Sequence, residues 1–282
     1  MLFWGMSFVW SSILLDYYQP VTIIFIRLII SSGFLFLLIF LLKKQQKIHR
    51  KDYLLIFLSA IFNPFLYFLG ENYGLKFSSS TVTAVIIATI PVFSPIVARI
   101  TLNERLSWYN ITGILISFIG VVVMLLNKDM NIMIDPKGVL FLSGAVVSAL
   151  VYSVLLKKLS SDYSPLVLIA YQNLIGIFLF MPFFFFLEFR QFLTVTPDLK
   201  IVTSFLFLGI LASSLAYVFY AKTVKALGIS KTNIFTNLIP VFTAIFSFFI
   251  LSEYFTVLKV TGILIVIAGV IITELNQLKR KS

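Results

Sequence analysis

Hydrophobic and polar positions in this chain alternate on the scale of whole helices. Apolar runs close to the roughly 20 residues that cross the hydrocarbon core of a bilayer are separated by short stretches that hold most of the charge. The pattern predicts ten transmembrane helices: Met1–Leu15, Pro20–Leu42, Tyr53–Leu75, Ser80–Leu102, Trp108–Asn127, Pro136–Lys157, Pro165–Glu188, Leu199–Thr223, Ser230–Leu251 and Thr256–Leu275.

The first run is shorter than a normal span. Met1–Leu15 cannot cross a bilayer unaided, and Trp4 and Gly5 stand at its start. It has neither the basic leading segment nor the small-residue cleavage site of a signal peptide. We expect the sequence to begin inside the first helix, with residues missing upstream; a short, tilted or re-entrant helix is the alternative.

Composition supports a membrane protein. Of the 282 residues, 60% are apolar and 12% are charged, about half the charged share of a soluble domain. Such a chain cannot cover a core with polar surface, so its solvent must be lipid. The predicted fold class is therefore an all-α membrane protein.

The net charge of +11 indicates membrane orientation rather than nucleic-acid binding, because the basic residues lie between apolar runs and not on one polar face. If the N-terminus is cytoplasmic, 15 of the 22 Lys and Arg residues fall in cytoplasmic connections and six fall outside. Positive charge is enriched on the cytoplasmic side of membrane proteins. Both termini are therefore predicted to be cytoplasmic.

A stretch of 33 residues occurs twice, 149 positions apart. Ile90–Val122 aligns with Ile239–Ile271 without a gap, and 14 pairs are identical. The register keeps a proline, an acid and two glycines: Pro91 on Pro240, Glu104 on Glu253, Gly113 on Gly262 and Gly120 on Gly269. This indicates duplication; shared composition of membrane helices is the alternative.

The duplication also predicts an inversion. An offset of 149 moves the fourth predicted helix onto the ninth and the fifth onto the tenth, a shift of five helices. Because five is odd, the halves insert in opposite orientations. We expect two inverted five-helix repeats, 1–130 and 131–282, in one membrane unit. Transporters use such repeats to expose a central site to each side in turn.

These features resemble the EamA family of the drug/metabolite transporter superfamily over essentially the whole chain. The resemblance rests on the five plus five helices, the doubled Pro-Val-Phe…Glu…Gly-x₆-Gly block, and four further residues or pairs: Trp4-Gly5, Ser7-Phe8, Pro20 and Arg27. It implies a solute carrier of the bacterial inner (plasma) membrane. Members of this family export amino acids, other metabolites or toxic compounds, and some take solutes up.

The second half departs from the first at two positions. Ala149-Leu150 stands where Trp4-Gly5 would align, and Gln172 replaces Arg27. A strictly symmetric site is therefore not expected.

Uncharged side chains near middle depth are the candidates for a solute cavity. In lipid, polar groups must face protein or water. A cavity built from them would be aromatic, rich in amides and mostly uncharged, which suits a small amphipathic organic solute better than an inorganic ion. Hydrogen bonding between helices is the competing interpretation for about half of them. The candidates are Trp4, Ser7, Asn63, Tyr67, Thr89, Tyr152, Tyr171, Gln172, Asn173, Ser213, Tyr217, Asn233 and Asn237.

Arg27 is the exception to a membrane interior nearly free of charge. Glu71, in the outer part of the third predicted helix, is its nearest obvious partner. The two would form an outer-gate ion pair, or Arg27 would anchor a substrate carboxylate. An arginine that snorkels or bonds to carbonyls at a helix end is an equally weighted alternative.

The repeated block predicts structural roles. Pro91 and Pro240 fall in mid-helix and are predicted to act as hinges or to line a cavity. Glu104 and Glu253 precede new helices, where a carboxylate satisfies free N–H groups. The glycines of the block, seven residues apart in each half, are predicted to let helices pack closely: Gly113, Gly120, Gly262 and Gly269.

Several function classes lose support. The chain has no Cys, and its one His, His49, lies in a charged connection. Metalloprotease, phosphate-binding-loop and dinucleotide-binding motifs are missing from the sequence. We therefore predict no enzyme activity, no metal, no cofactor and no nucleic-acid partner. The predicted partners are a small-molecule solute and the lipid bilayer. Proton coupling stays open, as does the choice between monomer and homodimer.

We expect a secondary transporter that moves small organic metabolites by alternating access. The resemblance favours amino acids or related compounds, and export. A passive channel or facilitator, a translocator of lipid headgroups or lipid-linked sugars, and a structural membrane subunit are the alternatives.

Overall fold

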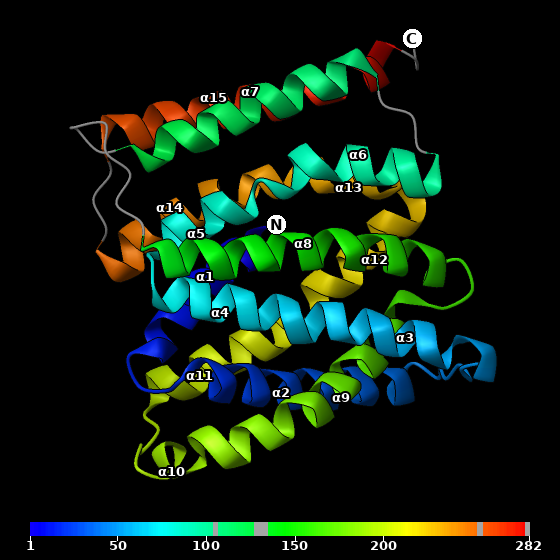
Figure 1. Cartoon of the computed structure of the whole chain (residues 1–282), viewed down its shortest axis with the longest axis vertical. Coiled ribbons are helices and arrows are strands. Elements are labelled where there is room, and N and C mark those ends of the chain that lie inside the picture. Colours follow the sequence, from blue (N-terminus) through cyan, green and yellow to red (C-terminus); the bar gives the residue numbers. More distant parts are fainter. Residues whose placement is uncertain (104–106, 127–134, 253–255, 280–282) are drawn as a thin grey trace.

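The computed structural model describes residues 1–103, 107–126, 135–252 and 256–279, and every regular element in them is a helix (Figure 1). Glu104 and Glu253, predicted at helix N-termini, lie outside the described residues.

The helical elements follow one another with short connections. In chain order they are α1 (Leu2–Leu15), α2 (Pro20–Leu41), η1 (Arg50–Asp52), α3 (Tyr53–Ala60), η2 (Ile61–Leu66), α4 (Tyr67–Lys76), α5 (Ser80–Ile87), α6 (Ile90–Leu102), α7 (Trp108–Leu125), α8 (Pro136–Leu159), α9 (Pro165–Phe183), η3 (Phe184–Glu188), α10 (Phe189–Phe192), α11 (Leu199–Phe207), η4 (Leu208–Ala216), α12 (Tyr217–Leu227), α13 (Ile229–Ile234), η5 (Phe235–Leu238), α14 (Ile239–Leu251) and α15 (Val257–Lys279).

Seven helical stretches of the described chain are long and apolar enough to cross a bilayer: Pro20–Leu41, Arg50–Lys76, Ser80–Leu102, Pro136–Leu159, Pro165–Phe192, Leu199–Leu227 and Ile229–Leu251. Shorter apolar helices at Leu2–Leu15, Ile111–Val123 and Val260–Ile272 occupy the places of the first, fifth and tenth predicted spans. The chain is an integral, multi-pass, all-helical membrane protein.

Local sequence explains where the helices begin. Pro20, Pro136 and Pro165 stand in the first turns of α2, α8 and α9, where a backbone N–H would have no helical partner. The side chains of Ser79 and Asp198 accept hydrogen bonds from the first turns of α5 and α11. These residues separate one apolar run from the next.

The two repeated prolines lie in the middle of the helical stretches Ser80–Leu102 and Ile229–Leu251, as predicted, but the α-helix is interrupted just before each of them. In the first half, α5 ends at Ile87 and α6 begins at Ile90, which makes Pro91 the second residue of a new helix. In the second half, the 3₁₀ turn η5 precedes α14, and Pro240 is again the second residue. Proline is tolerated there because its missing N–H would have no helical acceptor. Each proline marks the restart of a helix after a break.

The repeat extends to the ends of the restarted helices. Asn103 after α6 and Ser252 after α14 both adopt the left-handed conformation, with φ of 54° and 56°. The two positions are 149 residues apart, the offset of the sequence repeat.

Two other spans are irregular near their middle: at η2 the chain is kinked, with a non-helical backbone at Asn63 (φ −149°, ψ 118°) before Pro64, and η4 is a π-helical turn. Such a turn disturbs the regular pairing of backbone carbonyls. Side chains bond to carbonyls of η4: the indole Nε1 of Trp4 donates to the carbonyl oxygen of Ala212 over 3.2 Å, and Ser214 Oγ donates to that of Gly209 over 2.7 Å. A membrane interior requires such internal partners, because lipid offers none.

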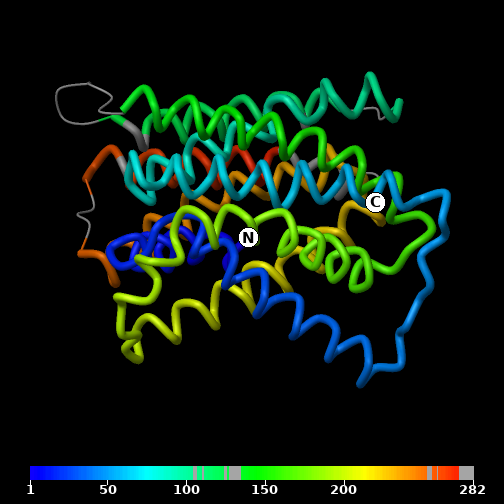
Figure 2. Tube along the Cα trace, turned by 60° about the horizontal axis from the view of Figure 1, so that its bottom comes forward, coloured from blue at the N-terminus to red at the C-terminus, as the bar shows by residue number. Residues whose placement is uncertain are grey.

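The helices lie side by side, with α7 and α15 paired along one edge of the molecule (Figure 1). The broken helices α5/α6 and α13/α14 come next, α1, α8 and α12 lie centrally, and α2 and α9 are near the opposite edge (Figure 1). Figure 2 shows the C-terminal part of α2 diverging from its neighbours before the chain leads back to α3. The broken helices are thus inner elements, and the unbroken pair α7 and α15 lies outside them.

Repeated glycines lie where α7 and α15 approach most closely. A Cβ atom added to Gly120 would lie 2.7 Å from both the carbonyl oxygen of Gly262 and the backbone nitrogen of Val266. One added to Gly269 would lie 2.7 Å from the carbonyl oxygen of Gly113. The glycines therefore bring two backbones together, as predicted from their spacing.

Hydrogen bonds join helix ends to one another or to connections at two ends of the bundle. At one end, Tyr163 Oη donates to Asp52 Oδ2 over 2.6 Å, and Lys157 Nζ donates to the carbonyl oxygen of Val224 over 3.0 Å. At the other, Glu188 Oε2 accepts from the backbone N–H of Thr22 over 2.6 Å. The connections at the first end are among those that the charge count places in the cytoplasm, and the orientation itself stays a prediction.

We expect Gly120→Ala to destabilise the protein by about 1–3 kcal/mol, because the atoms in its way belong to the backbone of α15 and cannot rotate aside. Thermal unfolding in detergent measures the effect. Gly144→Ala in α8 is the matched control, since a Cβ there meets nothing within 4 Å. Equal stability of the two variants would contradict close packing at Gly120.

Candidate functional site

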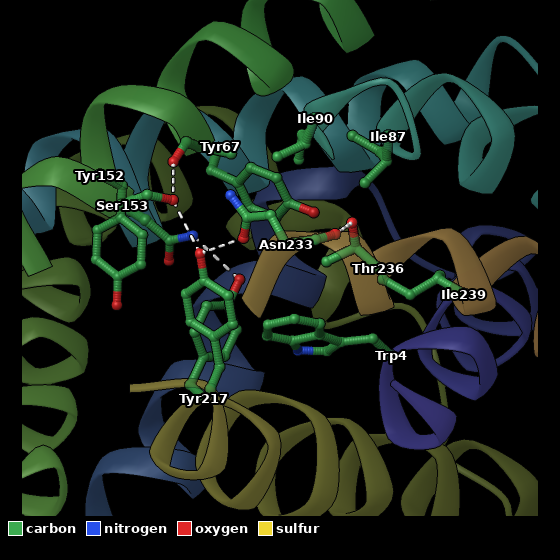
Figure 3. Close-up of a pocket in the computed structure, with 13 residues that line it drawn as sticks. Trp4, Tyr67, Ile87, Ile90, Tyr152, Ser153, Tyr217, Asn233, Thr236 and Ile239 are labelled. Atoms are coloured by element: carbon green, nitrogen blue, oxygen red, sulfur yellow. Dashed lines mark hydrogen bonds between the residues drawn. The ribbon is translucent and has the colours of Figure 1, made fainter. Parts of the chain in front are cut away.

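A cavity lies where α1, α4, α8 and α12 meet the breaks of the helices that carry Pro91 and Pro240 (Figure 3). The space inside it that a water-sized sphere can occupy is about 40 Å³, well below the roughly 300–1,000 Å³ usual for ligand pockets, so the lining side chains must move apart to admit an organic solute. Thirteen residues line it, and none is charged: Trp4, Asn63, Tyr67, Ile87, Ile90, Ala149, Tyr152, Ser153, Tyr217, Tyr220, Asn233, Thr236 and Ile239.

Aromatic rings form one side of the cavity. The ring of Trp4 lies 4.9 Å from that of Tyr217, edge to face, and 5.3 Å from that of Tyr220. The ring of Tyr152 lies 6.4 Å from that of Tyr217, also edge to face. Edge-to-face pairs add about 0.5–1.5 kcal/mol each beyond their burial. The rings therefore hold one another in place and offer a solute rigid, flat surfaces.

Polar atoms of the lining bond mainly to one another. Asn63 Nδ2 donates to Tyr217 Oη over 3.0 Å, which joins the kink in η2 to the first residue of α12 across the cavity. Tyr220 Oη donates to Asn233 Oδ1 over 2.8 Å and lies 2.8 Å from Ser153 Oγ. Asn233 Nδ2 is buried without a hydrogen-bond partner. The lining thus keeps one free amide group.

Equivalent positions of the two halves face the same cavity. Ile87 and Thr236 differ by 149 positions, as do Ile90 and Ile239, and all four line the cavity. Trp4 also lines it, together with its counterpart Ala149. Both copies of the repeat therefore contribute equivalent positions to this cavity.

A buried ion pair lies behind the cavity lining. Arg27 Nη1 is 3.5 Å from Glu71 Oε2, and the two residues are 1% and 6% exposed. Arg27 Nε donates to Ser213 Oγ over 2.8 Å, and the guanidinium carbon lies 4.1 Å from the ring centre of Phe68. Tyr67, which lines the cavity, donates from Oη to Glu71 Oε1 over 3.2 Å. The predicted pairing is present, and one tyrosine hydroxyl connects it to the cavity.

The cavity offers ring faces and hydrogen bonds rather than reactive groups. Among the described residues, no group of three or more His, Cys, Asp or Glu is placed to hold a metal ion. What the lining can do chemically is bind a small amphipathic molecule.

The sequence of the described fold matches the EamA-like transporter family model twice, over residues 1–126 and 136–275. The chain belongs to the EamA-like transporter family.

Relatives of this EamA-like chain are also transporters by name. A protein of Archaeoglobus fulgidus named an uncharacterized transporter is 29% identical over 270 residues, covering 96% of this chain and 94% of its own. The uncharacterized transporter YoaV of Bacillus subtilis is 25% identical over 287 residues, with 99% and 96% covered. One solved crystal structure has a TM-score of 0.78 at 16% identity and covers 98% of both chains, which shows a shared fold.

Six of the thirteen predicted cavity residues line the cavity of this EamA-like protein: Trp4, Asn63, Tyr67, Tyr152, Tyr217 and Asn233. The other seven do not.

Four of these seven bond between helices, as the competing interpretation held, and three of the four join α9 to its neighbours. Gln172 accepts from Tyr152 Oη over 3.1 Å and donates to Ser59 Oγ over 2.9 Å. Asn173 Nδ2 donates to Ser31 Oγ over 2.7 Å and to the carbonyl oxygen of Ser213 over 3.2 Å. Ser213 also accepts from Arg27. These side chains fasten α9 to its neighbours.

Of the others, two bond to the backbone of their own helix, Asn237 is the fourth that bonds to another helix, and Tyr171 lies in a separate groove. Ser7 Oγ donates to the carbonyl oxygen of Trp4 over 2.7 Å, and Thr89 Oγ1 donates to that of Ile86 over 2.8 Å. Asn237 donates to Ser117 of α7. Tyr171 faces a groove beside α2, where its ring lies 5.6 Å from that of Phe36.

Sequence reasoning missed seven lining residues: Ile87, Ile90, Ala149, Ser153, Tyr220, Thr236 and Ile239. A search restricted to polar residues could not find the isoleucines or the alanine. The signal for five of the seven was the repeat, because they align with one another or with Trp4. Ser153 and Tyr220 follow Ala149 and Tyr217 by four and three residues, so they share helix faces with them.

We expect single substitutions of the buried pair to cost about 3–5 kcal/mol, because each leaves one charge unpaired inside the protein. Arg27→Met and Glu71→Gln are the two variants, and the measurement is unfolding in detergent. The double variant should lose clearly less than the sum of the two. Additive losses would show that the two side chains do not stabilise each other.

Proposed function

We propose that this EamA-like protein is a secondary transporter that carries small organic metabolites across the plasma membrane. The supporting observation is a cavity without charged side chains, lined by equivalent positions of both halves at the points where their helices break. A cavity lined by both copies of a repeat suits a site that opens to each side of the membrane in turn.

The proposed topology has ten spans in two inverted repeats, 1–130 and 131–282, with both termini in the cytoplasm. Shorter apolar helices at the places of the first, fifth and tenth spans support this count. The matching left-handed ends at Asn103 and Ser252 support the repeat.

In the proposed alternating access, the restarts at Pro91 and Pro240 are the hinges. A helix that already ends before the proline bends there without losing further backbone hydrogen bonds. Arg27 and Glu71 form the outer gate, held shut by their pairing. The close packing of α7 against α15 makes this pair the scaffold against which the broken helices move.

The family resemblance favours amino acids or related compounds as substrates, and export as the direction. The rings and amides of the lining support an amphipathic solute over an inorganic ion.

Flux from liposomes that contain only the purified chain tests the proposal. We expect saturable movement of a small metabolite, and we expect Trp4→Ala to lower it by about tenfold because ring contacts worth about 0.5–1.5 kcal/mol each are lost. Leu264→Ala, on the exposed face of α15, is the control. Flux that does not saturate would indicate a channel, and no flux with any solute would reject transport. Full flux in Arg27→Ala would reject the gate.

Cysteine labelling tests the topology, and the absence of native Cys makes it clean. In intact cells, a membrane-impermeant thiol reagent should label Thr196→Cys, between α10 and α11, and spare Gln45→Cys, between α2 and α3. Both positions are exposed, so burial cannot explain a difference. The opposite pattern would invert the proposed orientation.

A further inference from the structure

The amide of Asn233 is the least satisfied polar group of the cavity lining. The residue is 1% exposed; its Oδ1 accepts from Tyr220, and its Nδ2 has no partner. Leaving a buried polar group unpaired costs about 1–3 kcal/mol. Figure 3 shows Asn233 among the lining residues, with its side chain bonded to Tyr220 and its carbonyl oxygen bonded to Thr236. Because Asn233 belongs to the cavity lining, a solute that widened the cavity would lie next to this free amide atom.

The hydroxyl groups nearest to Asn233 already have partners of their own. Tyr220 also contacts Ser153 and packs its ring against Trp4. Thr236 Oγ1 is used by the carbonyl oxygen of Asn233 itself, over 2.6 Å. A polar group of a ligand would supply the hydrogen-bond partner that Asn233 Nδ2 lacks.

The charge of the lining decides what kind of polar group that is. None of the thirteen residues is charged. The nearby ions Arg27 and Glu71 pair with each other, and Arg27 is further engaged by Ser213. An ionic ligand group would stay unpaired within the membrane at a cost of several kcal/mol. A neutral group would bond to Asn233 without that cost.

We infer that the solute of this site is uncharged, with an apolar, flat body held between the rings and the isoleucines and a neutral polar group bonded to the amide of Asn233. The inference rests on the proposed function and narrows it from amino acids and related compounds to neutral amphipathic molecules, such as amides. Ile87, Ile90 and Ile239 supply the apolar surface opposite the aromatic side.

Four ligands with one ring and different polar groups test this inference: phenylacetamide (neutral), phenylacetate (anion), phenethylamine (cation) and phenylalanine (zwitterion). Binding to the purified full chain at pH 7 is measured by calorimetry, and flux is measured in liposomes. We expect phenylacetamide to bind at least about tenfold more tightly than each of the other three, since a factor of ten corresponds to only about 1.4 kcal/mol. Equal or tighter binding of an ion or of phenylalanine would overturn the inference, and so would no binding by any of the four.

Two variants identify the amide. Asn233→Leu should weaken phenylacetamide binding by about tenfold through the loss of one buried hydrogen bond. Asn233→Asp adds a carboxylate and should shift preference toward phenethylamine. Ser247→Ala is the control, because Ser247 is also buried without a partner but lies outside the cavity lining. Unchanged selectivity in both Asn233 variants would overturn the assignment, even if one of them were less stable.

The two proposals can fail separately. Binding of phenylacetamide through Asn233 without flux of any solute would reject transport and keep the ligand assignment. Saturable flux that prefers phenylalanine or an ion would keep transport and reject the neutral solute.

Discussion

Every backbone carbonyl that a broken helix releases inside a bilayer must find a partner within the protein, and this requirement shapes the centre of the molecule. The helices around the cavity break, and nearby side chains bond to their carbonyls. Trp4 reaches from α1 to Ala212 in η4, and Thr89 and Thr236 bond to carbonyls at the two restarts. The same tryptophan then offers its ring to the cavity. Some of the side chains that bond to carbonyls at the breaks therefore also line the cavity.

The broken and the unbroken helices have different roles in this fold. The pair α7 and α15 packs backbone to backbone through glycines such as Gly120 and Gly269, and the thirteen residues that line the cavity all come from other elements. The inner helices contain restarts, π-helical turns and the buried ions Arg27 and Glu71. Substitutions in the outer pair should therefore act mainly on stability, whereas substitutions inside act on binding.

Helix positions follow closely from the apolar runs, because length and hydropathy decide what lipid can accept. The pairing of Arg27 with Glu71 was also predictable, since a lone buried arginine needs a partner. The prolines predicted where the helices are interrupted but not the form of the interruption, because apolar periodicity is the same in an α-helix and in one interrupted by two residues. The cavity was found only in part for a related reason: polar side chains such as Gln172 and Asn173 serve either a cavity or a neighbouring helix, and sequence does not say which way they turn.

The two halves build one cavity from matching positions, yet the free amide of Asn233 belongs to the second half alone, and its counterpart in the first half is Ala84. Two similar halves therefore enclose a cavity whose two ends differ, because only one of them carries the free amide. A solute bound through its polar end would keep the same orientation relative to the protein, whichever side of the membrane the cavity opened to. During transport the solute would enter with one end first and leave with the other end first. It would therefore not need to rotate inside the cavity.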